Sequence, residues 1–305
     1  MASISVSVPS EQLAENLADV EGADVFVWKM DGAPPRTDID LVVPPYMTDG
    51  DPLAALAGVR TRLVQSQSIG YEGVADRLPD GVVYANAATV HEASTAELAL
   101  ALTLGAQREF VRFVQAQETG SWSPVRAASL ADRRVLVLGY GGVGKAVAAR
   151  LAPFEVEVVA VASHARTEAG VQVHGVDDLP DLLPSAEIVV LTLPGGDQTK
   201  HIVDDAFLAA LPDGALLVNV GRGSLVDTDA LVDHVRRGRI RAALDVTEPE
   251  PLPADHPLWT LEGVLISPHV GGATTAMFPR VEQLIRRQIA HLQQGEEPEN
   301  IVIRT

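Results

Sequence analysis

The chain has 305 residues, enough for two domains with separate hydrophobic cores. Its formal net charge of −18 argues against nucleic acid or an anionic membrane as a partner, because both bind basic protein surfaces. Cysteine is absent, which excludes disulfides, a thiolate nucleophile and a cysteine metal site. The sequence lacks the roughly 20 consecutive apolar residues of a membrane helix, and its N-terminus lacks the features of a signal peptide. We therefore expect a cytoplasmic protein.

Short apolar runs alternate with polar or helix-like segments through roughly the first ninety residues, a pattern typical of a parallel sheet covered by helices. Helix-like segments are Ser10–Val20 and Pro52–Ala57. The strands that we expect are Ile4–Val8, Asp24–Trp28, Ile39–Val43, Arg62–Gln65 and Val82–Tyr84. This part of the chain is predicted to form a first α/β domain.

The longest helical pattern covers Ala93–Glu118 and is broken by the following Gly-Ser-Trp-Ser-Pro. Ser94 is a plausible N-cap, and Glu97, three residues later, completes a capping box. The length and apolar content of this segment predict a helix that also buries surface against a partner subunit.

A glycine-rich turn follows between two apolar strands. Val135–Leu138 is apolar throughout, as expected of a strand buried on both faces, and runs into Gly139-Tyr140-Gly141-Gly142-Val143-Gly144. Ala146–Leu151 is predicted to be a helix and Val156–Ala162 a second buried strand. In such a setting a G-x-G-x-x-G turn indicates dinucleotide binding, because its glycines permit a tight turn, close approach of a diphosphate and close helix–strand packing.

Further strands and a final helix, Ala276–Gln294, complete the alternation. The expected strands are Glu187–Leu193, Leu216–Val220, Arg241–Val246 and Val264–Ser267. Ligands bind at the carboxyl ends of strands in a doubly wound sheet, and Arg222, Glu250 and His269 lie in loops at those ends.

Taken singly, each of these three residues has an ordinary structural alternative: a protein-internal ion pair, a solvated acid or a satisfied buried histidine. The glycines on both sides of Arg222 are expected to leave the backbone free to approach a ligand. Together, the three suit hydride transfer to a 2-oxo acid: Arg222 binds the carboxylate, His269 supplies a proton, and Glu250 raises the pKa of the His. The eight histidines lack H-x-x-x-H spacing, so no metal site is expected.

Several separate motifs of the chain occur in the order found in the D-isomer-specific 2-hydroxyacid dehydrogenases, a family that the chain resembles over essentially its whole length. They are SIGYE (68–72), STAEL (94–98), the glycine turn, LPGGDQTKHIV (193–203), NVGRGSLVD (219–227), ALDVTEPEPLP (243–253) and SPHVGGAT (267–274). The resemblance implies an α/β fold of two doubly wound parallel-sheet domains. A Rossmann dinucleotide-binding domain, residues 95–274, is inserted in a flavodoxin-like substrate domain, residues 1–94 and 275–305, with the active site in the cleft. It also implies a homodimer formed largely through the cofactor domain.

The resemblance implies roles for individual residues. Arg222 matches the family's substrate-binding and catalytic arginine, Glu250 its histidine partner and His269 its acid/base. Ile69 and Gly70 match a loop whose backbone holds the substrate carboxylate. Tyr46 and Met47 line the substrate pocket or serve in packing, an alternative that stays open. The cofactor-binding set comprises Thr95, Gly139, Gly141, Gly142, Val143, Gly144, Ser163, His164, Arg166, Leu193, Pro194, Thr199, Val220, Gly221, Asp245 and Gly271, with Thr95 and Asp245 near the nicotinamide.

The sequence departs from the NAD-specific pattern after the second Rossmann strand. An acid that binds the ribose 2′-hydroxyl is expected there, but Ala162 takes its place and Ser163, His164 and Arg166 follow. These side chains suit a 2′-phosphate, so NADP(H) is predicted, with NAD(H) as the alternative. Glu155 stands where the family often has Gly and is expected at a surface turn.

The predicted activity is NAD(P)H-dependent reduction of a small 2-oxo acid of the glyoxylate or hydroxypyruvate type. A dehydrogenase for a bulkier 2-hydroxy acid is an alternative. Another is a non-catalytic dinucleotide sensor resembling the C-terminal-binding-protein corepressors, although the chain lacks a basic patch and appended partner-binding segments.

Overall fold

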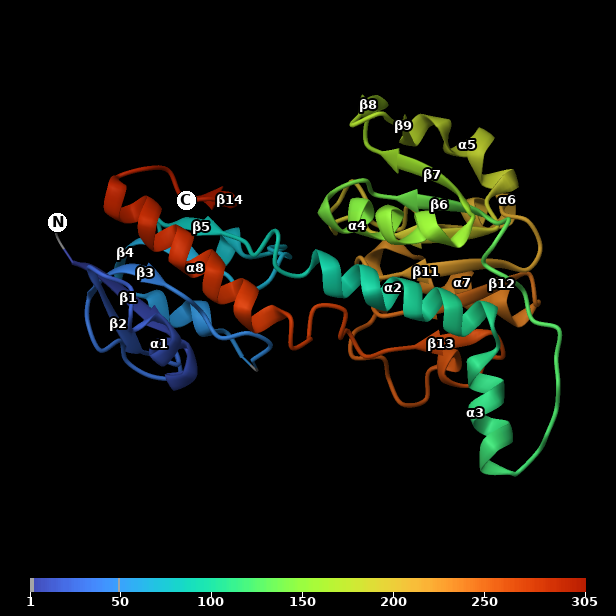
Figure 1. Ribbon diagram of the computed structural model, residues 1–305, viewed down its shortest axis with the longest axis horizontal. Coiled ribbons are helices and arrows are strands. Elements are labelled where there is room, and N and C mark those ends of the chain that lie inside the picture. Colours follow the sequence, from blue (N-terminus) through green and yellow to red (C-terminus); the bar gives the residue numbers. More distant parts are fainter. Residues whose placement is uncertain (1–2, 49) are drawn as a thin grey trace. The chain divides into compact units, whose positions relative to one another are not determined.

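The computed structural model describes residues 3–48 and 50–305. They form two compact units (Figure 1): the first comprises the described residues of Met1–His91 together with Thr275–Thr305, and the second comprises Glu92–Thr274. The division between the units lies at the start of helix α2 (Glu92–Gln107), and the boundary expected between residues 94 and 95 lies three residues further along the chain. None of the helices in the described part of the chain is both long and apolar enough to cross a bilayer.

A six-stranded sheet forms the centre of the first unit. Its spatial order is β14-β5-β4-β3-β1-β2, with parallel pairs throughout except for the antiparallel edge strand β14. The strands are β1 (Ile4–Val8), β2 (Ala23–Val27), β3 (Asp38–Val42), β4 (Arg60–Gln65), β5 (Val83–Ala85) and β14 (Ile301–Arg304). The parallel part has the 2-1-3-4-5 order of flavodoxin-like sheets, which confirms the predicted fold class.

Helices α1 (Glu11–Leu17) and α8 (Met277–Gln294) supply Leu17, Ile285 and Ile289 to the core on one face of this sheet. The other face is covered by loops and by a 3₁₀ helix at Pro52–Leu56, within the segment predicted to be helix-like. Proline at the start of this segment and its short length favour the tighter helix.

An eight-stranded sheet forms the centre of the second unit, in the order β13-β12-β11-β10-β6-β7-β9-β8. Its strands are β6 (Arg134–Leu138), β7 (Glu157–Ala162), β8 (Arg166–Glu168), β9 (Val171–Gly175), β10 (Ile188–Leu191), β11 (Ala215–Asn219), β12 (Ile240–Leu244) and β13 (Val264–Ile266). The direction of winding reverses between β6 and β10, and a doubly wound sheet binds its ligand at such a switch point.

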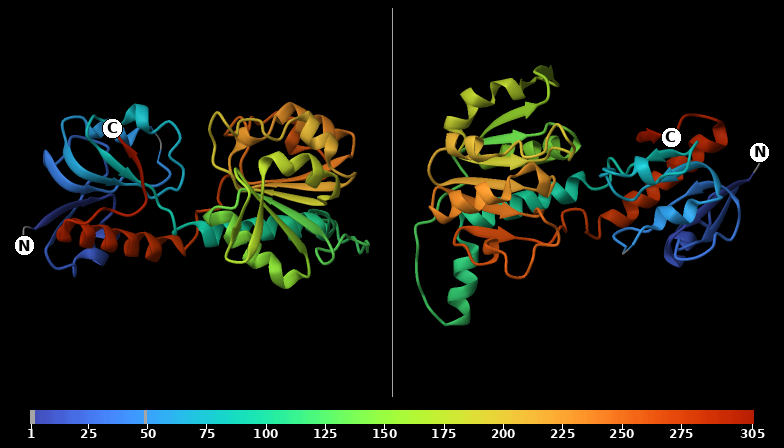
Figure 2. Two further views of the ribbon diagram at one scale, coloured as in Figure 1. Left: turned by 90° about the horizontal axis from the view of Figure 1, so that it is seen from above. Right: turned by 180° about the vertical axis from the view of Figure 1, so that it is seen from behind.

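Two helical layers enclose this second sheet (Figure 2). Val135 and Val137 of β6 pack toward α2 and α4 (Gly142–Leu151), whereas the alternate residues Leu136 and Leu138 pack into the opposite core. That core includes side chains of α5 (Leu179–Leu182), α6 (Asp205–Ala210) and α7 (Thr228–Arg236). Burial on both faces explains why the strand is apolar at every position.

The single helix predicted for Ala93–Glu118 is in fact two helices. After α2 the chain turns at Glu109, whose φ of 59° is left-handed, and α3 spans Phe110–Glu118. At the C-terminal end of α2, Arg241 of β12 donates to the Ala106 carbonyl at 3.3 Å and to the Gln107 side chain at 2.5 Å. No glycine or proline stands at residues 106–110 to signal the break, so the sequence did not reveal it.

The predicted N-cap role of Ser94 is also wrong. Helix α2 already begins at Glu92, and the buried Ser94 hydroxyl instead hydrogen-bonds the Thr274 hydroxyl at 2.7 Å. This contact ties together the two ends of the second unit, which are 180 residues apart.

Three strands were not predicted. β8 and β9 form an antiparallel hairpin beyond β7, and β14 adds to the edge of the first sheet. All three are short, with three to five residues each, and lie at or next to an edge of their sheet, so their pairing depends on a neighbouring strand more than on their own composition.

Candidate active site

Close packing forces glycine at the turn that joins β6 to α4. Gly139 has a φ of +106°, and a Cβ there would stand 2.8 Å from the backbone N of Leu193. A Cβ on Gly144 would stand 1.8 Å from the Gly139 carbonyl oxygen. Around Gly141, by contrast, a Cβ would meet nothing within 4 Å. The turn is thus packed on its inner side and open at Gly141, the residue that caps the N-terminus of α4.

The loop after β10 lies beside this turn and beside the arginine loop. A Cβ on Gly221 would stand 2.8 Å from the Leu193 carbonyl oxygen, so Leu193 contacts both glycine-containing segments. The Thr199 hydroxyl donates to the Pro194 carbonyl at 2.8 Å and closes the 193–203 loop on itself. Val220, at the end of β11, is buried.

Asp245 organises the loop that carries the candidate histidine. Its buried carboxylate accepts hydrogen bonds from the Ser267 hydroxyl at 2.6 Å, from Val270 N at 2.9 Å and from Gly271 N at 2.9 Å. Glycine is needed at 271, because a Cβ would stand 2.9 Å from the Asp245 carboxylate and 3.4 Å from Thr95. The structure thereby places Thr95, Asp245 and Gly271 together.

His269 follows directly in this loop, with a left-handed φ of +53°. Backbone strain of this kind persists where surrounding contacts impose it, here the bonds from His269 N to the carbonyls of Asp245 at 2.8 Å and Ser267 at 3.1 Å. The ring Nδ1 hydrogen-bonds a carboxylate oxygen of Glu250, which lies 19 residues away in the loop after β12. The two residues predicted to act together are therefore in direct contact.

Glu250 raises the pKa of His269 above its usual value, chiefly through this hydrogen bond and further through its negative charge. Partial burial of the ring opposes the increase, Asp245 adds to it, and the positive charge of Arg222 lowers the pKa. The net direction favours imidazolium, the form that can give a proton. The Arg222 charge is near enough to act on His269, so all three predicted residues share one electrostatic environment.

Buried contacts hold the arginine loop in place. The Asn219 side chain, 1% exposed, donates to the Arg222 carbonyl at 2.8 Å and accepts from Gly221 N at 3.0 Å. Arg222 itself donates to the Gly221 carbonyl at 2.8 Å. A Cβ on Gly223 would stand only 1.9 Å from the Thr247 carbonyl oxygen. Both glycines permit close packing.

Ser163, His164 and Arg166 lie after β7, as predicted. The hydroxyl of Ser163 and the ring Nδ1 of His164 are 3.1 Å apart. Arg166 donates to the Tyr140 carbonyl of the glycine turn at 3.3 Å, although it starts β8 and is further along the chain than an ideal ligand for this position. The β8–β9 hairpin returns Arg166 to the vicinity of the glycine turn.

Among the residues that the structure describes, no group of three His, Cys, Asp or Glu side chains is arranged to hold a metal ion.

Residues 100–271, more than half of the chain, match the family model for the D-isomer specific 2-hydroxyacid dehydrogenase, NAD binding domain. The chain belongs to the D-isomer-specific 2-hydroxyacid dehydrogenase family. It is accordingly an NAD(P)-dependent oxidoreductase.

Two relatives and one solved structure illustrate the similarity. The dehydrogenase is 32% identical to a glyoxylate reductase of Aeropyrum pernix over 80% of this chain and 77% of that protein. It is 35% identical to glyoxylate/hydroxypyruvate reductase B of Pectobacterium atrosepticum over 70% of each chain. A D-isomer specific 2-hydroxyacid dehydrogenase from Xanthobacter autotrophicus Py2, solved with NADPH and MES, is 29% identical and superposes with a TM-score of 0.82 over 99% of this chain and 98% of that one.

The glycine turn of this dehydrogenase fits a nicotinamide dinucleotide. Its inner side cannot accept a side chain at Gly144, and the open position at Gly141 leaves backbone exposed beside the first turn of α4. The N–H groups and the dipole of a helix N-terminus attract a diphosphate.

The remaining predicted residues of the dehydrogenase belong to its first unit. Ile69 accepts through its carbonyl a 2.8 Å hydrogen bond from Asn86, which fixes the 68–70 loop. Tyr46 stacks on His91 with ring centroids 5.5 Å apart and contributes to the core of the first unit, so at least a packing role is established for it. Met47 is 62% exposed and Gly70 is partly exposed.

Sequence reasoning missed residues that position the dehydrogenase's candidate catalytic groups. Asn219 and Ser267 hold the arginine and histidine loops, and His201 hydrogen-bonds Glu248, two residues before Glu250, at 2.8 Å. Asn219 is the one polar residue of the otherwise apolar strand β11 and stands at its carboxyl end, which is a signal that the sequence offers. Neither His201 nor Ser267 carries such a signal, because their partners are distant in sequence.

Proposed function

We propose that the dehydrogenase reduces a small 2-oxo acid of the glyoxylate or hydroxypyruvate type to the 2-hydroxy acid, with NADPH as the reductant. The single observation that carries the proposal is the hydrogen bond between His269 and Glu250 beside the charge of Arg222. Relatives named as glyoxylate and glyoxylate/hydroxypyruvate reductases support the substrate class.

His269 holds the proton that the product hydroxyl requires. Glu250 occupies Nδ1, which orients the ring and leaves Nε2 as the nitrogen that faces a substrate. A nicotinamide dinucleotide bound at the glycine turn would supply the hydride that the carbonyl carbon accepts. As the carbonyl π bond breaks, the Nε2 proton passes to the oxygen, and imidazolium becomes neutral imidazole.

Arg222 binds and orients the substrate. Its planar guanidinium matches a carboxylate with two parallel hydrogen bonds, and its charge polarises the neighbouring carbonyl. The buried Asn219 side chain fixes the Arg222 backbone through a hydrogen bond, so the guanidinium is carried by a loop that is held in place. From the family resemblance we also propose that the backbone of Ile69 and Gly70 binds a substrate carboxylate and that Tyr46 lines a substrate pocket.

The cofactor proposal rests on the end of β7. Ala162 is the last residue of this strand, followed by Ser163, His164 and Arg166, none of which repels a 2′-phosphate. The neighbour from Xanthobacter autotrophicus was solved with NADPH. We assign Gly139, Gly141, Gly142, Val143 and Gly144 to the diphosphate and Thr95, Asp245 and Gly271 to the nicotinamide end. Leu193, Pro194, Thr199, Val220 and Gly221 line the segment between them.

The decisive experiment measures kcat/KM for a panel of 2-oxo acids with NADPH and NADH, in the parent and in His269→Ala. We expect turnover of the small 2-oxo acids, at least tenfold preference for NADPH, and loss of turnover in His269→Ala with nearly unchanged cofactor affinity. Equal rates in variant and parent would refute the role of His269, and a tenfold preference for NADH would refute the cofactor choice. Tight cofactor binding without turnover of any 2-oxo acid would favour the dinucleotide sensor.

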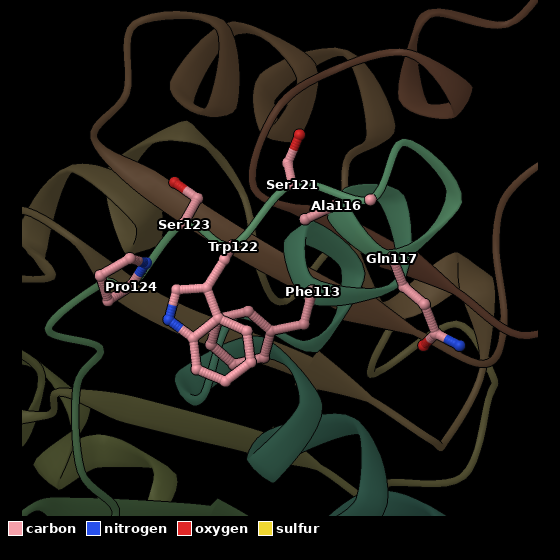
Figure 3. Close-up of a pocket in the computed structure, with 8 residues that line it drawn as sticks. Phe113, Ala116, Gln117, Ser121, Trp122, Ser123 and Pro124 are labelled. Carbon is pink, nitrogen blue, oxygen red and sulfur yellow. The ribbon is translucent and has the colours of Figure 1, made fainter.

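We also propose that the dehydrogenase forms a homodimer through α3. None of the nine residues of α3 is buried, and its apolar side chains Phe110, Phe113 and Val114 are 57%, 40% and 56% exposed. Phe113 and the 97% exposed Trp122 line a hollow of about 530 Å³ together with the segment that follows α3 (Figure 3). A second copy is the occupant that the family resemblance favours, and it would bury these rings together.

A further inference from the structure

Two cations share one carboxylate next to the glycine turn. Lys145, one residue after Gly144 on α4, forms an ion pair with Glu168 at the end of β8. Arg166, at the start of β8, contacts the same carboxylate through Nε at 3.0 Å and Nη2 at 2.9 Å.

The β8–β9 hairpin creates this cluster. Arg166 pairs with Val173 on β9, and β9 pairs in parallel with β7 up to the register Ala162–Gly175. The Arg166 guanidinium thereby reaches the Tyr140 carbonyl at 3.3 Å and the His164 carbonyl at 3.4 Å. The cluster thus lies between the glycine turn and the residues after β7, where a dinucleotide's adenosine ribose is expected in a Rossmann fold.

The charge balance of the cluster is positive, since Lys145 and Arg166 face one Glu168. Its side chains are 46%, 39% and 34% exposed, so a ligand can reach them. Lys145 and then Arg166, through their hydrogen bonds, lower the pKa of Glu168, which therefore stays ionised at neutral pH.

We propose that Glu168 is a built-in counter-ion with which the 2′-phosphate of NADP(H) competes for Arg166 and Lys145. Lys145 is then a second phosphate-binding cation, and the Lys145–Glu168 pair sets how strongly the protein discriminates between 2′-phosphorylated and unphosphorylated adenosine ligands. This inference rests on the proposed cofactor function.

The chemistry favours exchange of partners. A phosphate monoester carries a charge of about −1.5 to −2 and three strong acceptor oxygens, against one charge and two oxygens on a carboxylate. It can therefore displace Glu168 from both cations. The displaced carboxylate stays near and repels the phosphate. Glu168 therefore weakens the preference for 2′-phosphorylated ligands that Lys145 and Arg166 create. In the opposing arrangement, Glu168 would accept the ribose 2′-hydroxyl and favour an unphosphorylated ligand.

The test is calorimetric titration of the full chain with 2′,5′-ADP and with 5′-AMP, which differ in the 2′-phosphate and require no turnover. Glu168→Gln keeps the side-chain shape and removes the charge, and Lys145→Met keeps the aliphatic stem. We expect Glu168→Gln to bind 2′,5′-ADP roughly 5–10-fold more tightly and Lys145→Met roughly 5–10-fold more weakly, the size of one charge-assisted contact, with 5′-AMP affinity within twofold in both. Because the cluster is half-exposed, both effects should shrink in 0.5 M salt.

Asp181→Asn and Arg237→Met, exposed charge changes of the same sign elsewhere in the second unit, serve as matched controls and should alter neither affinity. Thermal unfolding confirms that each variant is folded. Unchanged 2′,5′-ADP binding in both variants would overturn the inference and leave the proposed function intact. Weaker binding of both ligands to Glu168→Gln would assign the carboxylate to the ribose and also overturn it. If the parent binds neither ligand, the cofactor site itself fails, and the proposed function fails with it.

Discussion

Gly223 provides the most direct test of how the site is held together. A Cβ at this position would stand 1.9 Å from the Thr247 carbonyl oxygen, 2.2 Å from its carbonyl carbon and 2.8 Å from Glu248 N. Real Cβ atoms essentially never approach other heavy atoms closer than 3.0 Å, so Gly223→Ala must separate the two backbones by at least about 1.1 Å. Gly223 adjoins Arg222, and Thr247 lies three residues before Glu250. The substitution therefore moves the arginine loop and the glutamate loop apart.

The cost can be estimated for stability and for activity. Overpacking a close contact costs about 1–3 kcal/mol, which lowers the Tm by roughly 2–4 °C per kcal/mol in a unit of this size. A displacement of about 1 Å at a catalytic group costs about 100-fold in rate. We therefore expect Gly223→Ala to remain folded at 25 °C, with kcat lowered about 100-fold.

The assay combines steady-state kinetics, cofactor titration and thermal unfolding. Cofactor affinity should fall much less than kcat, because the atoms that a Cβ on Gly223 would meet belong to Thr247 and Glu248 of the glutamate loop and not to the glycine turn. Gly32→Ala is a matched control, since Gly32 has no left-handed φ and a Cβ there meets nothing within 4 Å. If Gly223→Ala retained full kcat with an unchanged Tm, the packing of the two loops would not position Glu250, and this reasoning would be refuted.

Three further predictions follow from single contacts. In Glu250→Gln the main cause of the raised His269 pKa is lost, so the fall in reductive kcat/KM with rising pH, which tracks loss of imidazolium, should move to lower pH; an unmoved alkaline limb would contradict the assigned pairing. Glu155 is exposed with a left-handed φ of 59°, so Glu155→Gly should raise stability by about 0.5–1 kcal/mol at unchanged activity, and calorimetry showing a lower Tm would dispute the strain. Phe113→Asp should convert a dimer to a monomer in light scattering, whereas Glu118→Gln at the polar end of α3 should not; a parent that is already monomeric would end the dimer proposal.

The sequence alone determined the element types in most of both units, because buried parallel strands are apolar throughout and amphipathic helices show their period. It also determined the glycine turn and the three candidate catalytic residues, since each motif is local and lies at the end of a predicted strand. His269 and Glu250 do contact one another, as predicted.

Only the tertiary structure decided features that depend on partners distant in the chain. The long helix breaks at Glu109 where Arg241 meets its end, and Ser94 bonds Thr274 rather than capping a helix. The glycines beside Arg222 serve close packing because Leu193 and Thr247 press on them. Arg166 reaches the glycine turn through a hairpin whose weak strands form against β7. The periodicity of the sequence encodes which face of a helix or strand is apolar. The contacts described here depend instead on which other element packs against that face, and only the tertiary structure determines this.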